Sequence, residues 1–524
     1  MDTKALRQKI LDLAIRGKLV PQDPNDEPAS VLLGRIRQQK QQMVKEGKLK
    51  PKDIKNDSVI FVGEDNLHYE KFADGSVKCI EDEIPFELPD GWAWERLSNL
   101  ASFSGGKTPS TSRSEYWDGD ILWVTSKDMK SKYITSSQLR LSTLGAEQMQ
   151  MYQPDTLLLV TRSGILRHTL PVAILKECAT INQDLKAIIL YMPQLAEYIY
   201  VCLKGMETQL LLKYTKSGTT VENVNFDEFQ KVLLPIPPIQ QIDRIMSSTG
   251  SAESVVSTIE DDKAALADYV IKAKSKILDL AIRGQLVPQD PDDEPASVLL
   301  ERIRAEKEEL IKQGKLKRDK KESVIFRGED NSYYLRTGEL VESLEDWDFE
   351  ELPDSWSVCC LGELCDYGNC TNIDTADIAD SAWILDLEDI EKDSGVVLQK
   401  VRQGERNAGS TKHRFHKGQV LYSKLRPYLN KVVLADEDGY CTSEILPLEF
   451  ERNILPQYAR YFLMSPAFLR YANKCSYGVK MPRLGTADGK KAIISVPPVK
   501  EQKRIIMAIE LAFAQLASIA ENLA

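Results

Sequence analysis

One stretch of 25 residues occurs twice in this chain of 524, and no other feature limits the fold as strongly. Residues 9–33 read KILDLAIRGKLVPQDPNDEPASVLL, and residues 276–300 repeat them with two differences, Lys18 against Gln285 and Asn25 against Asp292. A long internal repeat decides the architecture before any single helix or strand is assigned. The chain therefore contains two copies of one structural unit.

The similarity continues in short blocks on either side of a long unlike region. Paired blocks occur at 35–50 and 302–317, at 58–66 and 323–331, at 86–97 and 349–361, and at 233–246 and 495–507. Between the last two pairs of blocks the copies have nothing in common. We interpret this pattern as two shared frames, each of which holds an insert of its own.

The frames predict long helices with a coiled-coil seam. After Pro238, apolar residues recur at the a and d positions of a heptad, interrupted by Lys263: Val256, Ile259, Leu266, Val270, Ala273, Ile277 and Leu280. After Pro498 the same spacing recurs at Ile506, Ile509, Phe513, Leu516, Ala520 and Leu523. Such a seam requires a partner helix.

The second of these helices stops with the chain, and its expected continuation, KALRQKILDLAIRG, stands at residues 4–17. We therefore expect a circularly arranged duplication whose two ends meet. Each helix should stop at Gly17 or Gly284, before the prolines of LVPQDP, and a second helix should follow over about residues 29–46 and 296–313.

The inserts have short β-branched runs between glycines, prolines and polar residues. These runs predict strands at 121–126, 155–161, 172–175 and 419–425. The expected fold is α+β: two globular α/β domains joined by two long antiparallel coiled-coil helices in a pseudo-twofold duplication. The expected regions are 1–56, a helical region completing the distal coiled coil; 57–236, the first domain; 237–320, the central helices; 321–497, the second domain; and 498–524, the last helix.

Composition excludes several classes of protein. We find no run of about 18 apolar residues, so we expect no membrane span. The nine cysteines are scattered and lack metal-ligand spacing, which favours reduced thiols in the cytoplasm. The net charge of −11 does not exclude a nucleic-acid partner, because binding depends on a local patch. A symmetric scaffold with two unlike heads fits double-stranded DNA. The DNA backbone has local twofold axes, whereas the base sequence does not have to follow that symmetry.

The motifs between the repeats resemble one known family. These are SGGKTPS and YWDGDILWVTSKDM within 104–129, TRSGI, PVAI and ATINQDL within 161–185, YSKLRPYLNKVVLADEDGYCTSEI at 422–445, and the junctions PPIQQIDRI and PPVKEQKRI. Over essentially its whole length the chain resembles the specificity subunit of Type I restriction–modification systems. One departure is that LLPIPPIQQ lacks the Glu-Gln pair present at Glu501 and Gln502.

The resemblance implies a division of labour. Two target recognition domains would each read one half of a bipartite DNA sequence. The helices would set the spacer and dock two methyltransferase subunits and, for cleavage, ATP-dependent restriction subunits. The chain itself would bind no cofactor, since S-adenosylmethionine and ATP with magnesium would be used by these partners.

Clusters of basic and amide side chains supply the candidate DNA contacts. Residues 402–431 hold eight Lys or Arg and one acid, Glu405, and Arg426 stands before Pro427, where an extended backbone is expected. The candidates in the second domain are Lys412, His413, Arg414, Lys424, Arg426, Tyr428, Lys431, Lys480 and Arg483. Those in the first domain are Lys107, Thr108, Ser110, Arg113, Lys127, Arg162, Arg167, His168, Asn182 and Gln183. An ordinary solvated face explains each of them equally simply, and the window 252–294 is acidic and should face away from phosphates.

Catalytic motifs are absent from the sequence. Gly106-Lys107-Thr108 fails as a phosphate loop because Ala101 occupies the position of its first glycine, and no adenine methyltransferase motif occurs. We therefore expect no enzymatic activity. The alternative is a non-catalytic bivalent adaptor that binds proteins or glycans; the acidic total favours it and the basic segment opposes it. A self-sufficient methyltransferase or nuclease would need the missing motifs.

Overall fold

The computed structural model describes residues 2–216, 221–315, 323–330, 332–344, 352–406 and 409–523. Parts of three repeated blocks, at 316–317, 331 and 349–351, and the side chain of the heptad residue Leu523 lie outside this description. The chain divides into two compact units, Met1–Asp262 and Lys263–Ala524. The two units are described separately.

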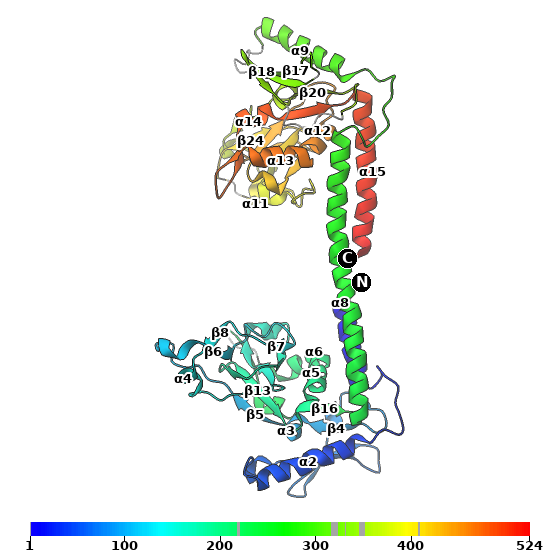
Figure 1. The fold of residues 1–524 in the computed structure, drawn as a ribbon, viewed down its shortest axis with the longest axis vertical. Helices are drawn as coiled ribbons and strands as arrows, with labels where there is room; N and C mark the ends of the chain where they lie inside the picture. Colours follow the sequence, from blue (N-terminus) through cyan, green and yellow to red (C-terminus); the bar gives the residue numbers. More distant parts are fainter. Residues whose placement is uncertain are drawn as a thin grey trace. The chain divides into compact units, whose positions relative to one another are not determined.

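The predicted frame helices are present. The first unit has α1 (Thr3–Ile15) and α2 (Ala29–Lys45), and the second has α9 (Ala296–Lys312) and α15 (Val499–Leu523). Helix α8 (Ile239–Ile282) is continuous across the boundary between the units (Figure 1). Asp2 caps the start of α1, because its carboxylate accepts a 2.9 Å hydrogen bond from the N–H of Ala5.

The repeated Arg-Gly dipeptide ends α1 and α8 in the same way. Gly17 and Gly284 have φ values of +65° and +69°, which favour glycine. A Cβ on Gly17 would lie 2.6 Å from Pro89, and one on Gly284 would lie 2.5 Å from Pro353. Glycine is therefore required at both positions for two reasons: the positive φ angle and the proline that would contact a Cβ.

Each unit pairs one end of α8 with a second helix in antiparallel orientation. In the first unit Arg7 of α1 bonds Glu253 at 2.7 Å and Glu260 at 2.9 Å, while Asp26, beyond the end of α1, is paired with Arg244 near the start of α8. Val256, a predicted seam residue of α8, is 1% exposed.

In the second unit α15 runs alongside α8 (Figure 1), with Lys274 of α8 lying over the Phe513 ring of α15. Just before α15, Ser495 donates to the Ile282 carbonyl at the end of α8 at 2.7 Å. The predicted seam is not buried at Leu266, which is 38% exposed. The physical reason is that α1 and α15 cover only the two ends of α8.

The head of the first unit is a pair of mixed sheets. The larger has the order β5-β13-β9-β11-β7 and the smaller the order β12-β6-β8. Their bounds are β5 Ala101–Gly105, β6 Trp117–Val124, β7 Tyr133–Ile134, β8 Leu139–Leu141, β9 Leu157–Val160, β11 Val172–Leu175, β12 Ala179–Ile181 and β13 Leu185–Leu190. Only the β11–β7 and β12–β6 pairings are parallel.

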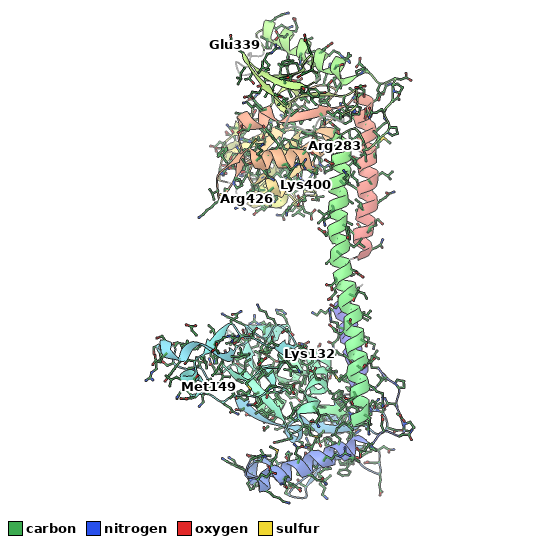
Figure 2. All side chains as sticks on the ribbon, viewed as in Figure 1. Lys132, Met149, Arg283, Glu339, Lys400 and Arg426 are labelled. Atoms are coloured by element: carbon green, nitrogen blue, oxygen red, sulfur yellow. The ribbon has the colours of Figure 1, made fainter. Side chains whose placement is uncertain are left out.

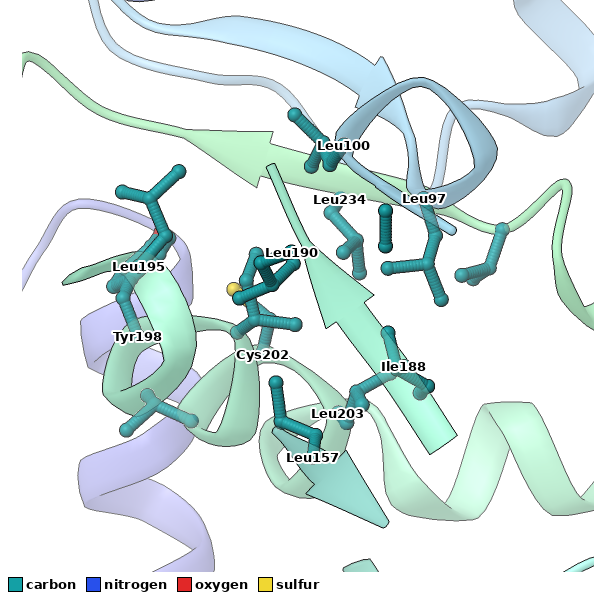
Figure 3. Close-up of a cluster of buried hydrophobic side chains, with 14 of the residues drawn as sticks. Leu97, Leu100, Leu157, Ile188, Leu190, Leu195, Tyr198, Cys202, Leu203 and Leu234 are labelled. Carbon is teal, nitrogen blue, oxygen red and sulfur yellow. The ribbon is translucent and has the colours of Figure 1, made fainter. Parts of the chain in front are cut away.

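Two helices, α5 (Ala196–Gly205) and α6 (Glu207–Tyr214), complete this head. Their apolar faces close on the larger sheet, where Leu157, Ile188, Tyr198 and Cys202 are fully buried (Figure 3). The predicted strands at 121–126, 155–161 and 172–175 therefore lie in the core of the head.

The head of the second unit has the same two-sheet plan with another sequence. Its sheets have the orders β21-β24-β27-β22-β23 and β26-β25-β28. Their bounds are β21 Asn372–Ile373, β22 Trp383–Leu385, β23 Val401–Arg402, β24 Lys412–Phe415, β25 Val420–Ser423, β26 Val432–Leu434, β27 Gly439–Thr442 and β28 Ile445–Leu448. Helices α12 (Pro456–Leu463) and α13 (Pro466–Lys474) close this core.

The two ends of each head are tied together by a short antiparallel pair. Strand β4 (Ala93–Arg96) pairs with β16 (Leu233–Ile236), and β20 (Ser357–Cys360) pairs with β31 (Ile493–Val496). Three-stranded meanders precede both pairs: β1 Ser58–Val62, β2 His68–Phe72 and β3 Val77–Cys79, then β17 Ser323–Arg327, β18 Tyr333–Thr337 and β19 Leu340–Ser343. Each head is thus an insertion whose ends leave the frame at one place.

One expectation from composition, the absence of a membrane span, is qualified by the structure. Helix α15 is, by length and composition alone, long and apolar enough to cross a membrane. It has no long unbroken apolar run because Glu510, Gln515 and Ser518 interrupt it. The helix packs Ile505 and Ile509 into the core of the second unit. All nine cysteines are free thiols, and the described residues contain no group of three or more His, Cys, Asp or Glu placed to hold a metal.

Candidate nucleic-acid interface

Four connections of the first head meet at one edge of its sheets. The loop after β5 is fixed there by the N–H of Lys107, which donates to the Ile181 carbonyl at 3.0 Å. Gly106 allows this approach, because a Cβ on it would lie 2.1 Å from the carbonyl oxygen of Asn182. The N–H of Asn182 in turn donates to Val124 at the end of β6, and that of Thr161 donates to Asp184 at 2.8 Å.

This edge brings together candidates from distant parts of the sequence. Lys107, Thr108, Lys127, Arg162 and Gln183 are all exposed on the meeting connections, and the Thr108 hydroxyl donates to the Gln183 side chain. Lys127 stands on a turn closed by the Asp128 carboxylate, which accepts from the N–H of Thr125 at 2.8 Å. We call these five residues the first-head edge.

The remaining candidates of the first head differ in solvent exposure and in whether their polar groups are already hydrogen bonded within the head. Ser110 and Arg113 are exposed further along the same loop, with the Arg113 guanidinium bonded to the Tyr116 hydroxyl at 2.9 Å. Asn182 is 7% exposed and shapes the turn by bonding Asp184.

Arg167 and His168 follow the short strand β10 (Arg162–Ser163) and are both exposed. Arg167 is paired at 2.8 Å with Glu222 of β15 (Glu222–Val224). The charge of Arg167 is therefore partly balanced within the head, whereas His168 lies on the surface beside it.

Part of the basic segment of the second head is neutralised by acids from other segments. Arg406 contacts Asp386 at 2.6 Å and Asp389 at 2.7 Å, and Arg402 contacts Glu437 at 2.8 Å. Counting charges along the sequence found one acid in this segment, because the acids that pair with it lie before and after it. Three of the eight cations of the segment, Arg402, Arg406 and Lys412, are thus ion-paired within the head.

Lys412 and His413 do not present their charges to solvent. Lys412 is 4% exposed and lies 3.1 Å from Asp386, and the His413 ring bonds the Ile445 carbonyl at 2.9 Å. Burial lowers the pKa of His413 below its ordinary value. Of the three candidates on β24, only Arg414 points outward.

Arg426 occupies a tight turn, and the expectation that its backbone is extended is wrong. Its φ and ψ are 49° and 64°, in the left-handed region. The proline rule disfavours the right-handed helical region but does not exclude this one. The turn is fixed from outside, because the N–H of Arg426 donates to the Pro482 carbonyl at 2.7 Å and the N–H of Leu484 donates to the Lys424 carbonyl at 3.0 Å.

The second head therefore has an edge equivalent to the first. Lys424, Arg426, Lys480 and Arg483 meet there, and the N–H of Lys424 donates to Glu444 just as that of Thr161 donates to Asp184. We call these four residues the second-head edge; Arg426 is exposed on it (Figure 2). Arg483 is paired with Glu444 at 2.8 Å, whereas Lys480 is exposed.

Tyr428 and Lys431 stand on the same turn as Arg426. Tyr428 is 46% exposed, and Lys431 donates to the Leu387 carbonyl at 2.6 Å. Burial lowers the pKa of Lys431. Sequence reasoning missed the exposed apolar side chains beside this turn, Tyr477, Val479 and Met481, because the search was for charge. The signal available in the sequence was Gly478 between the apolar residues Tyr477 and Val479, a pattern that indicates a turn with apolar side chains.

Comparison with known proteins assigns the family. Residues 89–252 and 353–519 each match the Type I restriction modification DNA specificity domain. The chain therefore belongs to this family, with two copies of its domain.

Named relatives carry the same description. The chain is 29% identical over 421 residues to the EcoAI specificity subunit of Escherichia coli and 27% identical over 427 residues to the EcoEI specificity subunit of that organism, alignments that cover 70% and 69% of this chain. They span only 63% and 61% of the lengths of those relatives. Among solved structures, the HsdS subunit from Thermoanaerobacter tengcongensis aligns at 15% identity over 84% of this chain and 94% of that one, with a TM-score of 0.38.

Proposed function

We propose that this chain is the DNA-recognition subunit of a Type I restriction–modification complex, in which each head reads one half of a bipartite target. One observation carries the proposal: in both heads the equivalent connections meet at one edge, and in both heads that edge collects exposed cationic side chains, Lys107, Lys127 and Arg162 in one and Arg426 and Lys480 in the other. Lysine and arginine gathered from several loops suit a phosphate backbone, and arginine can also read guanine.

The frames complete the proposal. Helices α1, α8 and α15 set the spacer between the half-sites and dock two methyltransferase subunits, with restriction subunits joining for cleavage. The chain performs no chemistry and binds no cofactor; the partners use S-adenosylmethionine, ATP and magnesium, and the methyltransferases flip an adenine out of the duplex. The assembly works on double-stranded DNA in the cytoplasm.

Purified complex of this chain with its methyltransferase provides the first test. Sequencing of methylated DNA should yield one bipartite motif, and affinity for duplex DNA should fall steeply with salt. The triple variant Lys107→Ala, Lys127→Ala and Arg162→Ala should weaken binding at one half-site. A matched control removes the same charge from exposed frame positions, Lys45, Lys52 and Lys71, and should bind as the wild type does. A bivalent protein or glycan adaptor would show no salt slope and no motif.

Modularity provides the second test, because the paired strands bring the two ends of each head together. Exchanging residues 100–235 for those of a relative should change one half of the methylated motif, and exchanging residues 357–497 should change the other half. A change of both halves by one exchange would contradict the assignment of one half-site to each head.

A further inference from the structure

A short hairpin of the second head exposes three large apolar side chains, two at its tip and one at the end of its stem. Strands β29 (Ser476–Tyr477) and β30 (Arg483–Leu484) form the stem, and residues 478–482 form the tip. Val479 is 102% exposed, Tyr477 63% and Met481 44%. Single exposed apolar residues are ordinary, but three within five positions on a projecting loop need a physical reason.

The hairpin is a fixed element of the head. The carbonyl of Pro482 accepts the Arg426 N–H at 2.7 Å, and the Ser476 hydroxyl donates to the Ala472 carbonyl at 2.6 Å. Gly478 turns the chain with φ +99°. Val479 is therefore held outward by a supported turn, so a partner would meet it without first having to order it.

The charges around the tip indicate the class of partner. Lys480 lies within the tip, and Arg426 and Lys424 lie on the turn to which the tip is hydrogen bonded. An apolar loop tip surrounded by cationic side chains is complementary to a polyanion whose groove has apolar groups on its floor. Duplex DNA has this character, because phosphates line its grooves and the thymine methyl groups lie on the floor of one of them.

The width of the hairpin selects the groove. A two-stranded ribbon fits the major groove of B-DNA, about 12 Å wide, but not the minor groove, about 6 Å wide. In the major groove the C5-methyl group of thymine is the apolar feature of the base edges, and small apolar side chains contact it.

From this geometry we propose that the tip reads thymine in the second half-site through contact of Val479, supported by Met481, with the C5-methyl group. The inference rests on the proposed function and adds the base and the chemical group that one part of the second head recognises. The first head offers no equivalent in sequence, since its corresponding segment, Lys216-Ser-Gly-Thr-Thr-Val221, holds no large apolar residue before Val221.

Uracil substitution tests the contact directly, because deoxyuridine differs from thymidine only by that methyl group. In the complex with methyltransferase, each thymine of the second half-site is replaced in turn. One replacement should weaken binding by the wild type about fourfold, the factor that corresponds to burial of one methyl-sized group. The variant Val479→Ser should bind thymine and uracil duplexes alike, while the control Val341→Ser, at an exposed valine of β19, should keep the wild-type preference.

The outcomes separate the inference from the function on which it rests. If the wild type methylates its motif but no uracil weakens binding, or if the uracil effect persists unchanged in Val479→Ser, the thymine contact is wrong and the proposed function stands. If Val479→Ser instead weakens association with the methyltransferase, the tip is a protein contact and the inference is likewise overturned. If the wild type produces no bipartite motif, the proposed function and the inference fall together.

Discussion

The main-chain N–H of Arg426 points at the carbonyl oxygen of Pro482, 2.7 Å away, and this one bond joins two segments of the second head that lie more than fifty residues apart. It fixes the left-handed turn that places the Arg426 side chain on the surface, and the hairpin that carries Val479. Because the bond uses only backbone atoms, the side chain of Arg426 can be changed without breaking it.

Replacing Arg426 by glycine should separate recognition from stability. Glycine adopts the left-handed backbone freely, whereas another residue pays roughly 1–2 kcal/mol for it. We expect Arg426→Gly to weaken binding by about 1–3 kcal/mol at the second half-site if the guanidinium contacts a base. Calorimetry should show unchanged or higher thermal stability, while Arg426→Ala should lose binding without that gain. A loss that is uniform over all sequences would identify a phosphate contact, and no loss would remove Arg426 from the interface.

Lys412 and Arg414, two positions apart on β24, should respond in opposite ways, because Lys412 is buried against Asp386 whereas Arg414 is exposed. Lys412→Ala removes a buried partner of Asp386, which keeps its contact with Arg406, so the unfolding free energy should fall by about 1–3 kcal/mol with unchanged affinity of the folded protein. Arg414→Ala should weaken DNA binding without loss of stability. Denaturant titration and binding measured on the same preparations check both. Weaker binding by folded Lys412→Ala would contradict the buried role.

Stability of the first unit should depend on pH through Glu83. Burial alone would raise the pKa of this carboxyl, but hydrogen bonds from Arg96 and Lys78 outweigh it and lower the pKa to about 2. A carboxyl whose pKa is lower in the folded than in the unfolded state stabilises the fold above its unfolded pKa, and that contribution is lost as pH falls towards 2. The difference in unfolding free energy between wild type and Glu83→Gln should therefore be full at pH 6 and shrink on acidification. Exposed Glu87→Gln is the matched control and should show little difference.

Length of α8 should set the length of the spacer. Four residues inserted near Ala265 add about 6 Å to the helix, close to two base pairs, and keep its faces nearly in register. We expect unchanged half-sites and a spacer longer by one or two base pairs, read by sequencing of methylated DNA. Four residues inserted in the exposed turn at 73–76 should leave the motif unaltered. An active α8 variant that keeps the original spacer would show that the helix does not set the distance.

Sequence periodicity predicted the helices closely because their signals are local. The proline-rich LVPQDP segments and the repeated glycines bound α2 and α9, whose predicted ends differ from Lys45 and Lys312 by one residue. Strands β9, β11 and β25 followed from β-branched runs for the same reason. Leu266 was assigned to the buried seam because a heptad pattern does not state where each partner helix begins and ends.

Prediction of the interface was weaker because its geometry depends on contacts between distant segments. Nothing near Arg402 in sequence indicates that Glu437 lies 2.8 Å from it, and nothing near Lys412 indicates Asp386. The local rule for residues before proline leaves both the extended and the left-handed backbone open to Arg426, and its hydrogen bond to Pro482 in another segment fixes the left-handed one. Composition can locate a basic segment, but only the fold decides which of its charges remain free.

The DNA affinity of the second head can change through substitution of its carboxylates as well as of its basic residues. The side chains of Arg402 and Arg406 are already placed by the fold. Arg402 is ion-paired with Glu437, and Arg406 is ion-paired with Asp386 and Asp389. Mutation of Glu437 to glutamine would release the charge of Arg402 at an existing surface position, with no new long side chain to accommodate. Substitutions of the acidic residues can thus change the DNA affinity of such a head while its arginines stay in place. Proteins descended from this one should therefore differ more at these Asp and Glu positions than at the Arg positions.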